Sequence, residues 1–204
     1  MLGWVGCAGS GTGSLSGTLY VARCTPDKDL GSLTAPVQYD MHPSYFVADP
    51  VDDLFRIHPN NRLAIRVQPS GNRLDEADAL YINIASDREV AASLGQAMTI
   101  GPSSNTRAAL LLHQLCPNAI SELELDGTLT FSAFGSANNS PPADDFRISY
   151  GDRLTATFSL DVIDRRAVLL GGNGSVATTP QTAGHLAGDF DFSISRGKSA
   201  QKYP

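Results

Sequence analysis

The amino-acid sequence predicts an all-β fold, an antiparallel β-sandwich with one short helix, for which a closed β-barrel is the alternative. Apolar and polar residues alternate along several segments, the pattern of strands with one buried and one solvated face. The 19 glycines and 12 prolines stand between short apolar runs, where strand reversals need a positive or a fixed φ. With 42% hydrophobic residues, the 204-residue chain can bury one core.

The strands are predicted from this alternation. In residues 62–67, leucine, isoleucine and valine share one face while two arginines point the other way. The same period recurs in residues 80–84, 123–131, 154–162 and 186–195. Each segment should therefore bury one face and expose the other, as strands of antiparallel sheets do.

One short helix is expected between these strands. Ser86 and Glu89 have the spacing of a capping box, and Gly95 stands where a helix would end. Residues 106–116 fit both a strand and a helix, because alternate residues are apolar and Leu111 and Leu115 are also four apart. Pro117 and the β-rich run after it favour the strand.

A short sequence frame occurs four times in the predicted strands. Each copy has a leucine, a small residue two positions later and another apolar residue two positions after that. The small residues are Gly17, Gly127, Ala156 and Gly188. Glycine weakens a strand, so its repeated use predicts a bulge, a sharp bend or room for an aromatic ring, with chance convergence as the alternative.

The N-terminal residues resemble a lipobox, the cleavage and lipidation motif of bacterial lipoproteins. Gly6 precedes Cys7, and a Gly/Ser/Thr-rich stretch follows as a flexible tether would. We therefore expect lipidation of Cys7, and Ala8 after it favours the outer membrane; the alternative is a free thiol in a loose tail. The expected division is a signal-peptide remnant and tether over residues 1–13, one β-sandwich domain over 14–197 and a tail over 198–204.

The other two cysteines, Cys24 and Cys116, have no CxxC partner. With Cys7 assigned to lipid, an even pair remains, and an oxidising compartment would join them in a disulfide. Closing a loop of about 90 residues would add about 4–5 kcal/mol of stability in the chain-entropy model. The alternative is two buried thiols that act as small hydrophobic side chains.

Charge and spacing argue against several classes of function. The net charge is −6 and no cluster of lysine and arginine is present, so we expect no nucleic-acid partner. No window has the 18 apolar residues of a membrane-spanning helix. The four histidines, His42, His58, His113 and His185, lack metal-ligand spacing, so neither a metal nor a cofactor is predicted.

A weak ligand site is predicted around residues 39–53. Three carboxylates come close together in the sequence there and could form a calcium loop, and aromatic residues beside them could floor a sugar or peptide site. A solvated turn and strand core are the respective alternatives. The candidates are Tyr39, Tyr45, Phe46, Asp49, Asp52 and Asp53.

Several segments together resemble the uncharacterised secreted lipoproteins of myxobacteria. They are Cys7, the strand opening at Gly17, residues 126–131, the strand start at Gly151 and the closing residues 188–204. The resemblance implies an envelope or secreted lipoprotein. Its motifs are structural, so it carries over no activity and no functional residue.

Two functions from different classes follow. The first, which we favour, is a non-enzymatic cell-envelope lipoprotein, attached to a membrane by lipid, that binds or scaffolds an envelope protein or a glycan. The second is an extracytoplasmic hydrolase that uses a carboxylate pair or a scattered Ser/His/Asp site. No G-x-S-x-G elbow is present, but the members of a triad meet only in space.

Overall fold

The structure, a computed structural model, describes residues 8–19, 37–51, 62–70, 77–114, 122–137, 148, 151–164 and 181–194. Within these residues the chain forms ten strands and one helix: β1 (Ala8–Leu19), β2 (Val37–Met41), β3 (Tyr45–Val51), β4 (Arg62–Gln68), β5 (Ala79–Ile84), α1 (Asp87–Ala92), β6 (Ala97–Ile100), β7 (Thr106–Leu111), β8 (Glu122–Phe134), β9 (Arg153–Asp164) and β10 (Gln181–Ile194).

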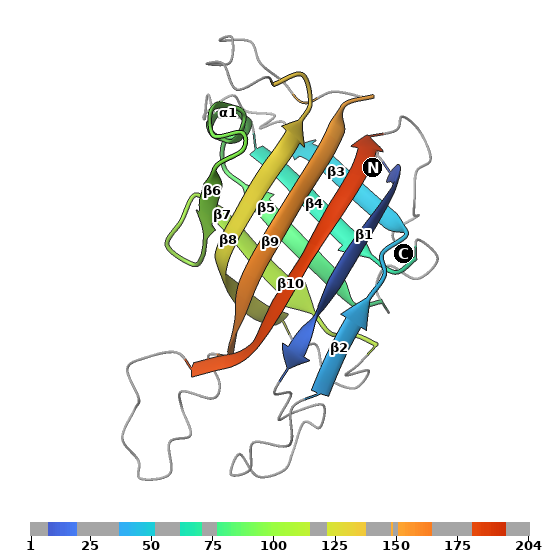
Figure 1. Cartoon of the computed structure of the whole chain (residues 1–204), viewed down its shortest axis with the longest axis vertical. Helices are drawn as coiled ribbons and strands as arrows, with labels where there is room; N and C mark the ends of the chain where they lie inside the picture. The colour runs from blue at the N-terminus through green and yellow to red at the C-terminus, as the bar shows by residue number, and fades with distance from the viewer. Residues whose placement is uncertain are drawn as a thin grey trace, which may run out of the picture.

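The strands form one strongly curled, mixed sheet in the order β10-β9-β8-β6-β7-β5-β4-β3-β1-β2, with further pairings of β10 with β1 and of β8 with β7 (Figure 1). The mostly-β prediction is confirmed. The purely antiparallel arrangement is corrected by one contact, because β6 and β7 pair in parallel at Ile100 and Thr106. Both strands run antiparallel to β8, so they must run parallel to each other.

The sheet folds back on itself into two facing layers (Figure 1). Strands β8, β9, β10 and β1 form the front layer, and β3, β4, β5 and β7 form the back layer. The sheet turns at β1 and β8, each of which pairs along one edge with two different strands. The start of β1 pairs with β3 and its end with β2, while β8 pairs with β7 and then with β6. Splitting an edge in this way lets strands change layer.

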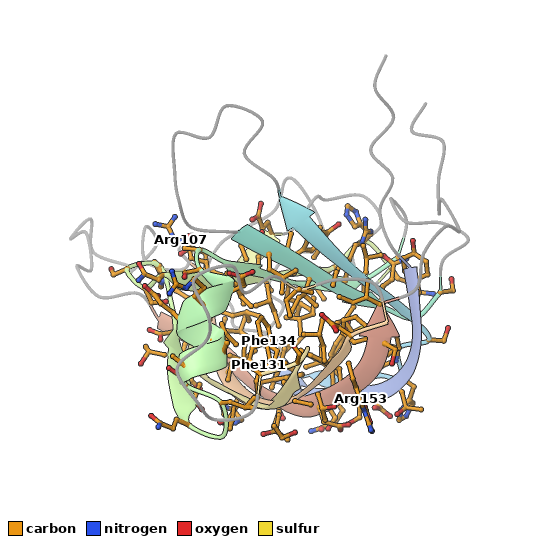
Figure 2. All side chains as sticks on the ribbon, turned by 90° about the horizontal axis from the view of Figure 1, so that it is seen from above. Arg107, Phe131, Phe134 and Arg153 are labelled. Atoms are coloured by element: carbon orange, nitrogen blue, oxygen red, sulfur yellow. The ribbon has the colours of Figure 1, made fainter. Side chains whose placement is uncertain are left out.

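Apolar side chains fill the space between the layers. Figure 2 shows Phe131 and Phe134 there. Their ring centroids are 4.9 Å apart. Phe190 lies 6.1 Å from Phe131, and its centroid is 5.7 Å from that of Phe192. Leucine, isoleucine and valine from the back layer complete the core, including Leu63, Ile65, Val67, Leu80 and Ile82. The predicted burial pattern is thereby confirmed.

The repeated frame places its small residues toward this core. A Cβ added to Gly17 or Gly127 would lie about 2 Å from a carbonyl oxygen of the adjacent strand, which indicates very close strand approach (2.0 and 2.2 Å). At Gly188 the same atom would meet the Ser14 carbonyl at 2.0 Å and Phe158 Cζ at 2.7 Å. The glycine therefore provides both the close approach and the room for an aromatic ring that the sequence suggested.

The predicted tether over residues 8–13 is wrong, because these residues belong to β1. Gly9 to Gly13 pair with Ile194 to Phe190 of β10. A Cβ on Gly11 would lie 2.3 Å from the Asp191 carbonyl oxygen, so glycine is needed here for close packing rather than for flexibility. Cys7 itself lies outside the described residues, as do Cys24 and Cys116 of the predicted disulfide.

The short helix is confirmed at Asp87–Ala92. The Ser86 side chain accepts a hydrogen bond from the Glu89 N–H, and Gly95 has a φ of 79° just beyond the helix. Residues 106–111 form β7, which confirms the strand interpretation for that stretch. Within the described ranges, no helix combines the length and the apolar character that crossing a bilayer requires.

Candidate functional site

Tyr39, a predicted ligand residue, lies in the core with 7% of its surface exposed. Its hydroxyl donates to Oδ2 of Asp78 at 3.2 Å, and Oδ1 of Asp78 accepts from the Gln114 N–H at 2.6 Å. Burial, and then the neighbouring Asp78 carboxylate, raise the pKa of Tyr39 far above its ordinary value. Tyr39 therefore ties β2 to the start of β5 and does not form a surface platform, which corrects its predicted role.

Phe46 and Tyr45 point to opposite faces of β3, as neighbours in a strand must. Phe46 is fully buried, and its ring stacks on Phe192 with centroids 5.1 Å apart. It is core, as the alternative interpretation had it, and cannot contact a ligand at the surface. Tyr45 is half-buried on the outer face of the back layer.

The predicted calcium loop is not assembled by the described residues. Asp49 belongs to β3 opposite Ala64, and β3 continues to Val51, so residues 49–51 are strand and not turn. Asp52 and Asp53 lie outside the described residues, as do the other acidic pairs at residues 75–76 and 144–145. No group of three metal-ligating side chains is present in the described part of the chain.

The outer face of the back layer carries a row of half-buried side chains. The register sets Val47, Arg66, Tyr81 and Ala109 side by side across β3, β4, β5 and β7. The Arg66 guanidinium lies over the Tyr81 ring, 4.9 Å from its centroid. Such a stacked pair is a firm, amphipathic surface, with apolar ring and stem beside a cationic head.

A hollow of about 480 Å³ lies next to this row, where β4, β5 and β7 approach α1. Leu63, Ile84 and Ala85 supply its apolar lining. The polar lining comes from two asparagines, a serine and an arginine: Asn83, Ser104, Asn105 and Arg107. Asn83 pairs in register with Arg107 and stands two residues beyond Tyr81, so the hollow and the row form one continuous surface.

Some polar side chains of the hollow already form hydrogen bonds within the protein, and others are exposed. The Ser104 hydroxyl shares its one proton between the backbone carbonyls of Gly101 and Thr106, and Nδ2 of Asn105 donates to Oε2 of Glu89 at 3.1 Å. Asn83 and Arg107 are exposed, and Figure 2 shows Arg107 at the outer surface of the back layer. These two residues are the groups best placed to meet a ligand.

Arg153, on the opposite outer surface (Figure 2), is engaged with a carboxylate. Its Nε donates to Oδ1 of Asp191 at 2.7 Å, and Thr155 donates to the same oxygen at 3.0 Å. The hydrogen bond from Arg153 is the main reason that the pKa of Asp191 lies below its ordinary value. The Arg107 side chain forms no hydrogen bond or ion pair with another described residue, which sets the two arginines apart.

The sequence allows a scattered Ser/His/Asp site without identifying its members, and the front layer contains one such set of hydrogen-bonded side chains. Ser159 Oγ lies 3.3 Å from Nε2 of His185, and Nδ1 of His185 lies 2.8 Å from Oδ1 of Asp161. The other described histidines form no such chain; His42 lies 3.3 Å from Asp40 in an exposed pair.

Sequence reasoning missed the hollow. Asn83 and Arg107 stand at outward positions of their strands, and alternation alone marks them as solvent-facing. Their meeting depends on the pairing of β5 with β7, across a helix and a short strand, which no periodicity encodes. No known protein family, curated protein or solved structure matches the chain.

Proposed function

We propose that the protein is a binding module of the cell envelope, built as a closed and filled β-barrel that holds its ligand on its outer surface. The observation that carries this proposal is the interior, which phenylalanine and leucine side chains occupy. A ligand cannot share that space without displacing the core, so recognition must take place outside it.

The strand pairings support closure. Starting at β1, successive pairs lead through β10, β9, β8, β7, β5, β4 and β3 and return to β1. The last link is short, with Ala8 opposite Val47 and Gly9 opposite Phe46. A closed ring of strands keeps water from the inner face and leaves few unpaired strand edges. The outer face and the hollow are then the surfaces on which a ligand can bind.

The hollow beside α1 is the proposed ligand site, and an acidic glycan is the proposed ligand. Arg107 supplies a cation that suits a carboxylate, and Asn83 supplies an amide that can both donate to and accept from sugar hydroxyls. Of the apolar lining, Leu63 and Ile84 are only 2% exposed and Ala85 is half-buried, so the polar side chains would make most of the contacts with a sugar. The rest of the protein is acidic, with a net charge of −6, so Arg107 would offer a local exception to the overall repulsion of anions.

The envelope location rests on the lipobox-like Cys7. Since β1 begins at Ala8, a lipid on Cys7 would hold the domain directly against the membrane surface. Mass spectrometry of the mature protein from native membranes tests this part. A diacylglyceryl cysteine at the N-terminus is expected, whereas a mature chain that retains unmodified Met1 would refute the anchor.

Calorimetry with tetragalacturonate tests the ligand site. The unaltered protein should bind it, and Arg107→Ala should weaken binding about tenfold or more, because a charge-assisted hydrogen bond contributes about 1.5–3 kcal/mol. Arg153→Ala is the matched control, since it removes an arginine from the opposite surface. The fully methyl-esterified tetramer, which lacks the carboxylates, should bind no better than the Arg107→Ala variant binds the acid.

Equal loss of binding in both arginine variants would show a diffuse electrostatic effect and would refute the site. Equal binding of the acid and its ester would refute the choice of an acidic ligand. If the protein binds neither tetramer, the glycan proposal falls and an envelope protein becomes the ligand to seek on the same surface.

A further inference from the structure

The chain of Ser159, His185 and Asp161 lies on the outer face of the front layer, away from the hollow. Ser159 and Asp161 are two residues apart on β9 and so share one face, and His185 stands opposite Asp161 on β10. Antiparallel pairing of β9 with β10 along nearly their whole length fixes these positions. The arrangement is therefore held by the sheet rather than by loops.

The order of contacts matches the order of roles in nucleophilic catalysis. Asp161 at 2.8 Å from Nδ1 holds the imidazole proton on that nitrogen, which leaves Nε2 with its lone pair. Nε2 lies 3.3 Å from Ser159 Oγ, within reach of the hydroxyl proton. We propose that Ser159 is a nucleophile toward activated esters, with His185 as general base and Asp161 as the residue that positions it.

The reaction would proceed in two balanced steps. Ser159 Oγ attacks the ester carbonyl while its proton passes to Nε2 of His185; the bond between the carbonyl carbon and the leaving oxygen breaks, and that oxygen takes the proton. A water molecule then attacks the acyl-serine, giving its proton to Nε2, and the Ser159 oxygen recovers a proton as the acid is released. No cofactor or oxidant is needed.

The surroundings define the substrate class and the size of the effect. His185 and Asp161 are 56% and 53% exposed, so the face is open and selects no large side chain. β9 pairs with a strand on each edge, so its backbone amides are engaged and cannot form an oxyanion hole. Thr128 stands opposite Ser159 on β8, and its hydroxyl is the cross-strand donor that we assign to the oxyanion. Small esters with good leaving groups are therefore the substrates that this site would accept.

Labelling with a small alkyl fluorophosphonate, followed by peptide mass spectrometry, tests the proposal. The probe forms a P–O bond to the serine and loses fluoride, and its rate reports how reactive the hydroxyl is. Ser159 should react about 100-fold faster than Ser16, because a positioned base contributes about 10²–10⁴-fold. Ser16 is the matched control, an exposed serine on the outer face of β1.

Variants separate reactivity from folding. His185→Gln keeps a polar side chain beside Asp161 but removes the base, so labelling of Ser159 should fall to the rate of Ser16. Asp161→Asn should slow it about tenfold or more and Thr128→Val by a smaller factor, while Ser16→Ala leaves Ser159 labelling unchanged. The residues are exposed, and an unchanged melting temperature checks each fold.

Two outcomes would overturn the inference. If Ser159 and Ser16 react at the same rate, the three side chains form only a solvated polar cluster. If Ser159 reacts fast but His185→Gln leaves that rate unchanged, the histidine is not the base. Neither outcome bears on glycan binding at the hollow, because the two sites lie on opposite layers.

Discussion

The two layers of the sheet are built differently. The front strands β1, β8, β9 and β10 are 12 to 14 residues long, whereas the back strands β3, β4, β5 and β7 have 6 or 7. Most of the inward phenylalanines and all the inward glycines of the repeated frame lie in the front layer. The back layer fills its side of the core mostly with leucine, isoleucine and valine.

The difference shows how a long strand bends around a core. Inward glycines let neighbouring backbones approach closely, and rings from other positions fill the space that the missing side chains leave. Short strands do not need this device, because aliphatic side chains reach across without bending the backbone. The outer faces differ as well, with hydroxyls and carboxylates in front and an aromatic–arginine row behind.

The largest effect is expected from the ring cluster of the front layer. Phe190 is fully buried and lies next to the rings of Phe131, Phe158 and Phe192. Phe190→Ala should destabilise the protein by about 3–5 kcal/mol. Ile65→Val in the back layer should cost only about 1 kcal/mol. Urea unfolding measures both, and equal costs would contradict the assignment of the main packing role to the front rings.

A smaller loss is expected from filling one frame glycine. Gly188→Ala would push a methyl group into the Ser14 carbonyl and the Phe158 ring, and should cost about 2–3 kcal/mol. Gly151→Ala is the control, since no atom lies within 4 Å of the added group and only its φ of 88° resists. Its cost should be about 1 kcal/mol. The comparison fails if Gly151→Ala proves the more damaging change.

The link between the layers at Tyr39 should be sensitive to alkaline pH. Tyr39→Phe leaves Oδ2 of Asp78 without this donor and should cost about 1–2 kcal/mol. Because folding raises the pKa of Tyr39, the stability it contributes is fully present below the ordinary tyrosine pKa of about 10 and is lost as pH rises above it. Urea midpoints between pH 8 and 11 should therefore fall more steeply for the unaltered protein than for Tyr39→Phe. Parallel slopes would contradict this role.

The smallest effect is expected at the exposed pair of Arg153 and Asp191. The pKa of Asp191 is lowered, so its stabilising contribution is present above the ordinary aspartate pKa and disappears as pH falls below it. Asp191→Asn should lower the melting temperature slightly at pH 7 and not at pH 2.5, and 1 M salt should reduce the difference. A large, salt-independent loss would mean that Asp191 does more than pair with Arg153.

Much of the fold could be predicted, because the alternation of apolar and polar residues indicates which side chains of each strand are buried. Leu63, Ile65 and Val67, or Phe190 and Phe192, show their inward face without any partner. The helix at Ser86 could likewise be predicted from its cap. These features depend only on neighbours in the chain.

The errors share the opposite cause, dependence on distant residues. Gly9, Gly11 and Gly13 have the composition of a tether, and only the approach of β10 makes them strand. Tyr39 and Phe46 were predicted as ligand-binding aromatics. Their burial depends on contacts with Asp78 and Phe192, which are distant in the sequence. The hollow at Asn83 and Arg107 and the chain at Ser159 and His185 arise from strand register, which a single sequence does not reveal.

The most direct test of the central claim, a sheet closed around a filled interior, is NMR at the seam between β1 and β3. Closure predicts cross-strand NOEs between Gly9 and Phe46 and between Ala8 and Val47, along with those between Gly13 and Phe190. It also predicts slow amide exchange on both edges of β1. NOEs to β10 without any to β3, together with rapid exchange along the free edge, would mean an open sheet and would contradict the account.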